Sequence, residues 1–270
     1  MTSTERSKLV VVVSDGGPVG LTFALNVAMM MMMCKKHIEI TIYEQRWFTD
    51  ENGRIHWRNE QQRNIRRDQV VTLQDHVIQQ LPLQIQKGLF TNIDERVWPT
   101  SRNIPIEEVE DRLLDLIQPF VQIGQVKLID KQFNELSQQL IDGEFDILVG
   151  VDGSNSFVHR YCNIELMSEG IEYACGVAYH LSDDQSLHQA LNCILTICQT
   201  RYLVNSSLSH RGYLNVRLTR SEYEELRTCL QMFEHSHETL DLIDYKSYFQ
   251  PSVWSIIRQD LHFCVLKKKC

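Results

Sequence analysis

The sequence contains few prolines and few glycines, 6 and 12 among 270 residues, which excludes collagen-like repeats and Pro/Gly-rich disorder. It also lacks a hydrophobic run long enough for a transmembrane helix, because the longest one, Leu21–Cys34, covers about 14 residues and includes Asn26. No signal-peptide pattern is present, since Met1–Lys8 is polar and the apolar run after it, Leu9–Val13, is short. We therefore expect a cytoplasmic protein with no integral membrane span.

The eight cysteines form no CxxC pair and no regular framework, which favours reduced thiols in the core over disulfides. The net charge of −8 argues against a nucleic acid or an anionic membrane surface as partner. The His235-Ser236-His237 pattern has no further acid or cysteine at ligand spacing, and we predict no metal site. Hydrophobic residues make up 43% and charged residues 23% of the chain, which is typical of a folded globular protein.

The N-terminal part of the chain has the pattern of a βαβ unit. Leu9–Val13 is an apolar, mainly β-branched run that predicts a strand buried on both faces, and a glycine-rich turn follows it. Leu21–Cys34 has the length and composition of a buried helix, and Ile38–Tyr43 predicts a second strand. Strand, turn, helix and strand in this order indicate a parallel sheet of the Rossmann-like α/β class.

The middle of the chain predicts further helices and strands. Val70–Leu81 has the composition of a helix and ends before Pro82. Pro105–Val121 carries apolar residues at helical spacing and acids in its first turn, which predicts an amphipathic helix. The apolar runs Val126–Ile129 and Phe145–Val151 predict two more strands.

Strand candidates follow one another without intervening helices after about residue 165. They are Tyr173–Leu181, Ala190–Thr200, Arg201–Asn205 and Gly212–Leu218. A helix is predicted over Ser221–Phe233, where Ser221 and Glu224 match a capping box. We therefore predict two domains, an α/β domain over residues 1–165 and a mainly antiparallel β-sheet (α+β) domain over residues 166–270.

The glycine-rich turn after the first predicted strand has the chemistry of a phosphate site. Close approach of a pyrophosphate requires residues without a Cβ, and the following helix offers free N–H groups. In the GxGxxG register the three positions are Asp15, Gly17 and Gly20, with Gly16 and Val19 between them. Asp tolerates a left-handed backbone, although a carboxylate near phosphate is unfavourable. By itself this turn is a weak signal for a nucleotide.

An acidic residue at the end of the second predicted strand strengthens that signal. Glu44 stands where a carboxylate accepts hydrogen bonds from the ribose hydroxyls of a bound adenosine. The alternative is a solvated glutamate beside Arg46. Strand, glycine turn, helix, strand and acid together favour dinucleotide binding over that alternative.

A second motif, Asp146–Ser156, lies in the last predicted strand of the α/β domain and the turn after it. The segments VVVSDGGPVGLTFAL, ITIYEQR and FDILVGVDGSNSFVHR together resemble the FAD-dependent aromatic-hydroxylase-type monooxygenases, typified by p-hydroxybenzoate hydroxylase. In that family the Asp-Gly pair of the second motif contacts FAD, and Asp152 and Gly153 match it. The family also has an arginine soon after the second strand, to which Arg46 corresponds. The resemblance implies that Arg66 and Arg67 lie near the pyrophosphate, whereas the alternative for this arginine-rich stretch is a solvated basic loop.

The resemblance implies a function as well. NAD(P)H would reduce the bound FAD, and a flavin C4a-hydroperoxide would then hydroxylate a small organic substrate held by the sheet-rich domain. No side chain of this sequence is nominated as catalytic, because the flavin carries the chemistry. The sheet-rich domain does not name the substrate.

One family feature is absent from the sequence. The family has a Gly-Asp pair after the substrate domain, and no such pair follows Gly153 here. We therefore expect a C-terminally truncated member with an incomplete FAD-binding domain. The alternatives are a catalytically inactive remnant or fragment that acts as a binding or interaction module, and an NAD(P)-dependent reductase, which would leave the Asp152-Gly153 motif unexplained.

Overall fold

The chain is divided into two structural units in the computed structural model. The first contains Met1–Asp94 and Thr100–Met167, and the second contains Glu95–Pro99 and Ser168–Cys270. The roles of a cofactor domain and a substrate domain stay a prediction. The structure describes residues 8–64, 66–67, 69–94, 96, 99–153, 156–165, 172–180, 194–195, 201–206 and 211–234.

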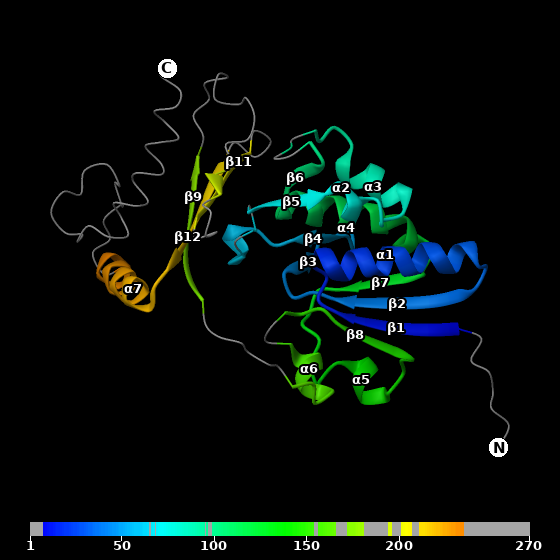
Figure 1. The fold of residues 1–270 in the computed structure, drawn as a ribbon. Helices are drawn as coiled ribbons and strands as arrows, with labels where there is room; N and C mark the ends of the chain where they lie inside the picture. The colour runs from blue at the N-terminus through cyan, green and yellow to red at the C-terminus, as the bar shows by residue number, and fades with distance from the viewer. Residues whose placement is uncertain are drawn as a thin grey trace. The chain divides into compact units, whose positions relative to one another are not determined.

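A parallel sheet of four strands forms the centre of the first unit (Figure 1). Its strands are β1 (Lys8–Ser14), β2 (His37–Tyr43), β7 (Val126–Ile129) and β8 (Ile147–Gly150), in the order β7-β2-β1-β8. All three pairings are parallel, and β1 pairs with both β2 and β8. The predicted βαβ unit and the Rossmann-like fold class are thereby confirmed.

The central strand β1 is buried on both faces, as its apolar run predicts. Val11 and Val13 belong to the main core, whereas Val12 packs with Phe133 and Val158 on the opposite face. All three valines are fully buried. The sheet therefore has a hydrophobic core on each side, as parallel sheets require.

Helix α1 (Pro18–Met33) connects β1 to β2 and contacts α4 (Ile106–Gln122). Its buried positions include Leu21, Leu25 and Ala28, which lie three or four residues apart. The prediction of a buried helix is wrong for the methionine-rich end, where Met33 is 80% exposed. That end extends past the core, so its outward methionines meet solvent.

The amphipathic helix predicted over Pro105–Val121 is confirmed as α4. Val109, Leu113 and Ile117 lie on its buried face and join the main core. Shorter elements complete the unit. They are β3 (Trp47–Thr49), β4 (Ile55–Trp57), η1 (Glu60–Gln62), α2 (Asp75–Ile78), α3 (Leu83–Phe90), α5 (Gln138–Asp142) and α6 (Phe157–Tyr161).

The helix predicted over Val70–Leu81 is wrong for its first half. Val70–Gln74 forms strand β5, which pairs antiparallel with β6 (Ser101–Pro105), and only Asp75–Ile78 is helical. β-Branched side chains lose rotamer freedom in a helix and fit a strand well. The partner strand comes from about 30 residues later in the chain, so a local pattern does not reveal it.

The described residues of the second unit form an antiparallel sheet and one helix, which confirms the predicted fold class. Its strands are β9 (Tyr173–His180), β10 (Ile194–Leu195), β11 (Arg201–Ser206) and β12 (Arg211–Leu218), in the order β10-β11-β12-β9. The remainder of the strand predicted over Ala190–Thr200 lies outside the described residues. Helix α7 (Arg220–Glu234) follows β12.

The predicted capping box of α7 is displaced by two residues. Thr219 Oγ1 accepts a hydrogen bond from the Glu222 N–H at 3.3 Å, and Glu222 Oε2 accepts one from the Thr219 N–H at 2.7 Å. Ser221 therefore lies inside the helix and does not cap it. Among the described helices of both units, none has the length and apolar character needed to cross a membrane.

Candidate functional site

The candidate site lies where β1, β2 and β8 end. Because β1 stands between β2 and β8, their carboxyl ends meet at one edge of the sheet, where open α/β folds bind ligands. A cavity of about 440 Å³ opens there. It is lined by Ser14, Asp15, Tyr43, Glu44, Gln45, Arg46, Arg67, Gln132, Phe133 and Asp152. The fold thus brings together five of the residues that sequence reasoning selects: Asp15, Glu44, Arg46, Arg67 and Asp152.

The glycines of the turn serve different purposes. A Cβ on Gly16 would lie 2.5 Å from the Trp47 ring, and a Cβ on Gly20 would lie 2.0 Å from the carbonyl oxygen of Asp15. Internal packing therefore requires both glycines. A Cβ on Gly17 would instead lie 3.4 Å from Arg46 Nη2 and from Asp15 Oδ2, which is an ordinary contact, and its φ of −65° suits any residue.

The first position of the turn is held by Asp15 in a left-handed conformation. Its φ is 89°, and its N–H donates to the Tyr43 carbonyl at 2.9 Å. Burial raises the pKa of Asp15 to about 8, with further contributions from its hydrogen bond to Glu44 and from the Glu44 charge. Arg46 and Arg67 oppose this rise. Asp15 therefore holds a proton near neutral pH.

The carboxylate of Glu44 is buried, only 3% exposed, and receives several hydrogen bonds. Its Oε1 accepts from the N–H of Arg46 at 2.8 Å and from Arg46 Nε at 3.0 Å, and its Oε2 accepts from Arg46 Nη2 at 2.7 Å. Burial acts to raise the pKa of Glu44, but the hydrogen bonds from Asp15 and Arg46 and the Arg46 charge lower it overall. The alternative of a solvated glutamate is therefore wrong, although the pairing with Arg46 is present.

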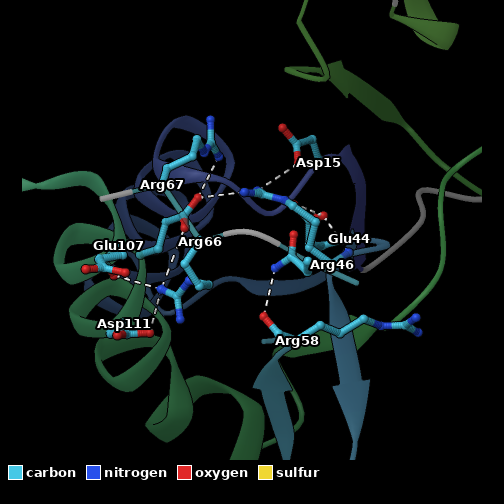
Figure 2. Close-up of polar contacts among 10 residues, drawn as sticks. Asp15, Glu44, Arg46, Arg58, Arg66, Arg67, Glu107 and Asp111 are labelled. Carbon is cyan, nitrogen blue, oxygen red and sulfur yellow. Dashed lines mark hydrogen bonds and ion pairs between the residues drawn. The ribbon is translucent and has the colours of Figure 1, made fainter. Parts of the chain in front are cut away.

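A buried carboxylate that sequence reasoning missed connects the arginines of the site, of which Figure 2 labels Arg46, Arg66 and Arg67. Glu110 on α4 is fully buried, and its Oε1 accepts from Arg46 Nη1 at 2.9 Å and from Arg67 Nη2 at 2.6 Å. Arg66 donates to Asp111 at 2.9 Å and lies 3.7 Å from Glu110. One signal was available: Glu110 occupies an apolar-face position of the predicted helix, three residues before Leu113.

Two tryptophans support the arginines from the β3–β4 hairpin. The guanidinium carbons of Arg46 and Arg66 lie 4.9 and 5.1 Å from the Trp57 ring centroid, and Trp47 packs edge-on against Trp57. The alternative of a solvated basic loop is therefore wrong for Arg46 and Arg66. The Arg67 side chain is 47% exposed, and among the described residues its guanidinium hydrogen-bonds only Glu110.

The Asp-Gly motif links β8 to β1. Asp152 Oδ2 accepts from Ser14 Oγ at 3.2 Å and from the Phe157 N–H at 2.9 Å, and Ser156 Oγ donates to its other oxygen. Gly153 follows with a φ of 75°, a conformation that favours glycine. Asp152 therefore fixes the turn before α6 while it faces the cavity.

The remaining predicted residue is Val19, which lies in the first turn of α1 and is 66% exposed. Among the described residues, no three His, Cys, Asp or Glu side chains gather as a metal site would require. His235 and His237 lie outside the described part of the chain.

Neither a protein-family model nor a curated protein matches the sequence. Solved structures do match. The crystal structure of P. aeruginosa PqsL in complex with 2-aminobenzoylacetate has a TM-score of 0.52 at 14% identity, over 82% of this chain and 64% of that one. A second structure of PqsL, described as a probable FAD-dependent monooxygenase from Pseudomonas aeruginosa, has a TM-score of 0.51 at 13% identity, over 83% of this chain and 66% of that one.

A third structure, p-nitrophenol 4-monooxygenase PnpA from Pseudomonas putida DLL-E4, has a TM-score of 0.47 at 15% identity, over 84% of this chain and 63% of that one. The two PqsL structures show that this chain shares the fold of PqsL. The chain spans just under two thirds of their length.

Proposed function

We propose that the first unit binds FAD through its adenosine diphosphate half, with the diphosphate over Gly17. The observation that carries this proposal is the contrast among the turn glycines. Packing explains Gly16 and Gly20, but a Cβ on Gly17 would make only ordinary contacts, at 3.4 Å or more, within the described protein. A diphosphate that approaches the backbone closely would account for the missing Cβ.

The N-terminus of α1 supports the same placement. The first backbone N–H groups of a helix have no intrahelical partner, and the helix dipole favours an anion at this end. Pro18 at the start of α1 has no N–H to offer, which leaves those of Val19 and Gly20 directed toward the turn. A diphosphate over Gly17 would accept from them.

The positively charged side chains on one side of the cavity suit a diphosphate. Arg46 donates to Glu44 and Glu110 and is thereby held in place, and Arg67 keeps donors beyond its bond to Glu110. Guanidinium groups form charge-assisted, bidentate hydrogen bonds with phosphate oxygens. Arg67 is therefore the side chain that we assign to the diphosphate, and the ribose hydroxyls would face Asp15 and Glu44.

We also propose NAD(P)H-dependent hydroxylation of a small organic substrate as the activity of the whole protein, in the cytoplasm. A bound, reduced flavin supplies the activation of molecular oxygen, so that one oxygen atom enters the substrate and the other leaves as water. The fold that the chain shares with PqsL supports this activity. The residues of the first unit contribute by binding and orienting the cofactor.

A second candidate function is a nucleotide-binding module without oxygenase activity. It is favoured by the carboxyl of Asp15 at a position where the family has glycine, and by the pairing of Arg46 with Glu44. This second function would be supported if the chain binds FAD but neither NADH nor NADPH reduces the bound flavin.

The test uses the full chain, incubated with FAD and desalted, with flavin absorbance and fluorescence as the readout. Wild-type protein should retain flavin in a fixed ratio to protein. Gly17→Val should lose it while the protein stays folded, because the branched side chain would occupy the place that we assign to the diphosphate. Val19→Ala is the matched control, since it shortens an exposed side chain in the same turn and should retain flavin.

Two results would contradict this placement. A folded, colourless wild-type protein that binds neither FAD nor ADP would exclude the proposed function. Full retention of flavin by Gly17→Val would exclude the diphosphate from this turn.

A further inference from the structure

We propose that Asp15 is the proton-bearing, hydrogen-bond-donating half of a carboxyl pair with Glu44, and that the site accepts a dinucleotide diphosphate only while Asp15 holds this proton. This role rests on the proposed function of the same site. It concerns the residue at which the sequence departs from the GxGxxG pattern.

The Asp15 carboxyl lies beside the glycine turn. A Cβ built on Gly17 would lie 3.4 Å from Asp15 Oδ2. The carboxyl therefore borders the space that we assign to the diphosphate. Its left-handed backbone, with a φ of 89°, fixes this direction and restricts the position to residues such as Asp, Asn and Gly.

The Glu44 carboxylate already carries a negative charge in a buried position, so a second carboxylate beside it is unfavourable. Arg46 donates three hydrogen bonds to its two oxygens, and Asp15 donates a further one. An ionised Asp15 would lose this bond and would place two carboxylates together in a largely buried site. The pair therefore holds one proton, and this proton lies on Asp15.

The charged groups that face Asp15 come from each element around the cavity. They are Glu44 and Arg46 after β2, Arg67 before β5, Asp152 after β8, and Glu110 of α4, which reaches Asp15 through Arg46. Burial and Glu44 outweigh the two arginines and raise the pKa of Asp15 to about 8. A diphosphate beside Asp15 adds negative charge and raises this pKa further.

The sign of the pH dependence follows from this order of pKa values. Below the pKa of free Asp15, the carboxyl is neutral with and without ligand, so the affinity does not change with pH. Above it, free Asp15 is ionised and must take up one proton on binding. The affinity should then fall about tenfold for each pH unit, until the pKa of the complex is reached.

The experiment uses the full chain and ADP-ribose, whose diphosphate keeps a constant charge across this range, with calorimetric titrations between roughly pH 6 and pH 9.5. Wild-type affinity should be constant at the acidic end and fall above about pH 8. Titrations in two buffers with different heats of ionisation should show uptake of close to one proton at the alkaline end. Tyr43 does not interfere, because burial raises the pKa of its hydroxyl.

Two variants distinguish the effect of the Asp15 proton on binding from the effect of the shape of the site. Asp15→Asn keeps the shape, the left-handed backbone and a donor toward Glu44, so its binding should show no pH dependence and no proton uptake. Asp15→Gly restores the glycine pattern and should also be independent of pH. Between about pH 6 and pH 9, wild-type affinity should fall roughly tenfold relative to the affinity of either variant.

The outcomes distinguish this inference from the proposed function. Wild-type binding that does not change with pH, or a pH profile that persists in Asp15→Asn, overturns the role of the Asp15 proton and leaves nucleotide binding intact. If wild-type protein, Asp15→Asn and Asp15→Gly all fail to bind ADP-ribose and FAD at any pH, the proposed function fails, and this role fails with it.

Discussion

Replacement of Glu110 by glutamine tests the charge network behind the site. The side chain is fully buried and is bound by Arg46 at 2.9 Å and Arg67 at 2.6 Å. Glutamine keeps the shape and one acceptor oxygen but removes the negative charge that these guanidinium groups surround. Loss of one partner from a buried ion pair costs about 3–5 kcal/mol. Because Arg67 is half-exposed and can turn to solvent, we expect a loss of about 3 kcal/mol in the free energy of unfolding.

The assay is urea-induced unfolding at neutral pH, followed by circular dichroism, together with the thermal midpoint. A loss of about 3 kcal/mol corresponds to a midpoint lower by roughly 6–12 °C for a unit of this size. Asp111→Asn is the matched control on the same helix. Its carboxylate is half-exposed and binds Arg66, so its removal should cost less than about 1 kcal/mol. Stabilities of Glu110→Gln and wild-type protein within about 1 kcal/mol, or equal losses in both variants, would refute this reasoning.

The remaining predictions concern two helix starts. Gly20→Ala should destabilise the protein by about 1–3 kcal/mol or more, because its Cβ would meet the Asp15 carbonyl oxygen. Gly17→Ala should cost less than about 1 kcal/mol, because its Cβ would make only ordinary contacts and alanine is merely a poorer N-cap than glycine. Thermal unfolding measures both, and equal midpoints would contradict the contrast between the two glycines. Thr219→Ala should lower the free energy of unfolding by about 0.5–2 kcal/mol through loss of the α7 cap, whereas Ser221→Ala should have little effect. The reverse order would return the cap to Ser221.

Local patterns were sufficient where one element determines its own environment. The run Leu9–Val13 predicts a strand buried on both faces, and α4 follows from the spacing of Val109, Leu113 and Ile117. In each case the spacing of apolar residues along the segment predicts which positions are buried. Such elements can be predicted without knowing which segments pack against them.

Local patterns gave wrong predictions where a distant strand or the limit of the hydrophobic core determines the local structure. Val70–Gln74 became a strand because Ser101–Pro105 offers it a hydrogen-bonding edge. Met33 is exposed because α1 continues beyond the core that covers its earlier turns. Neither the edge nor the limit of the core can be read from neighbouring residues.

The candidate site shows the same division. The chemical types in the glycine turn, at the end of the second strand and in the Asp-Gly motif point to a dinucleotide from the sequence alone. Their charge states depend on neighbours from other elements: Glu44 is buried, Asp15 holds a proton, and Arg46 contacts the carboxyl groups of Asp15, Glu44 and Glu110. Glu110, which organises two of the arginines, is separated from Arg46 by more than 60 residues.

The order of βαβ elements and the residue types at the strand ends are properties of the chain, because side-chain periodicity and glycine geometry act over a few residues. Burial, proton positions and ion pairing depend on which segments meet at the end of the sheet, because desolvation and Coulomb energies arise between groups far apart in the chain. The sequence therefore indicates a folded α/β protein with a glycine-rich turn of the nucleotide-binding type. Tertiary packing makes Asp15 a neutral donor at that turn.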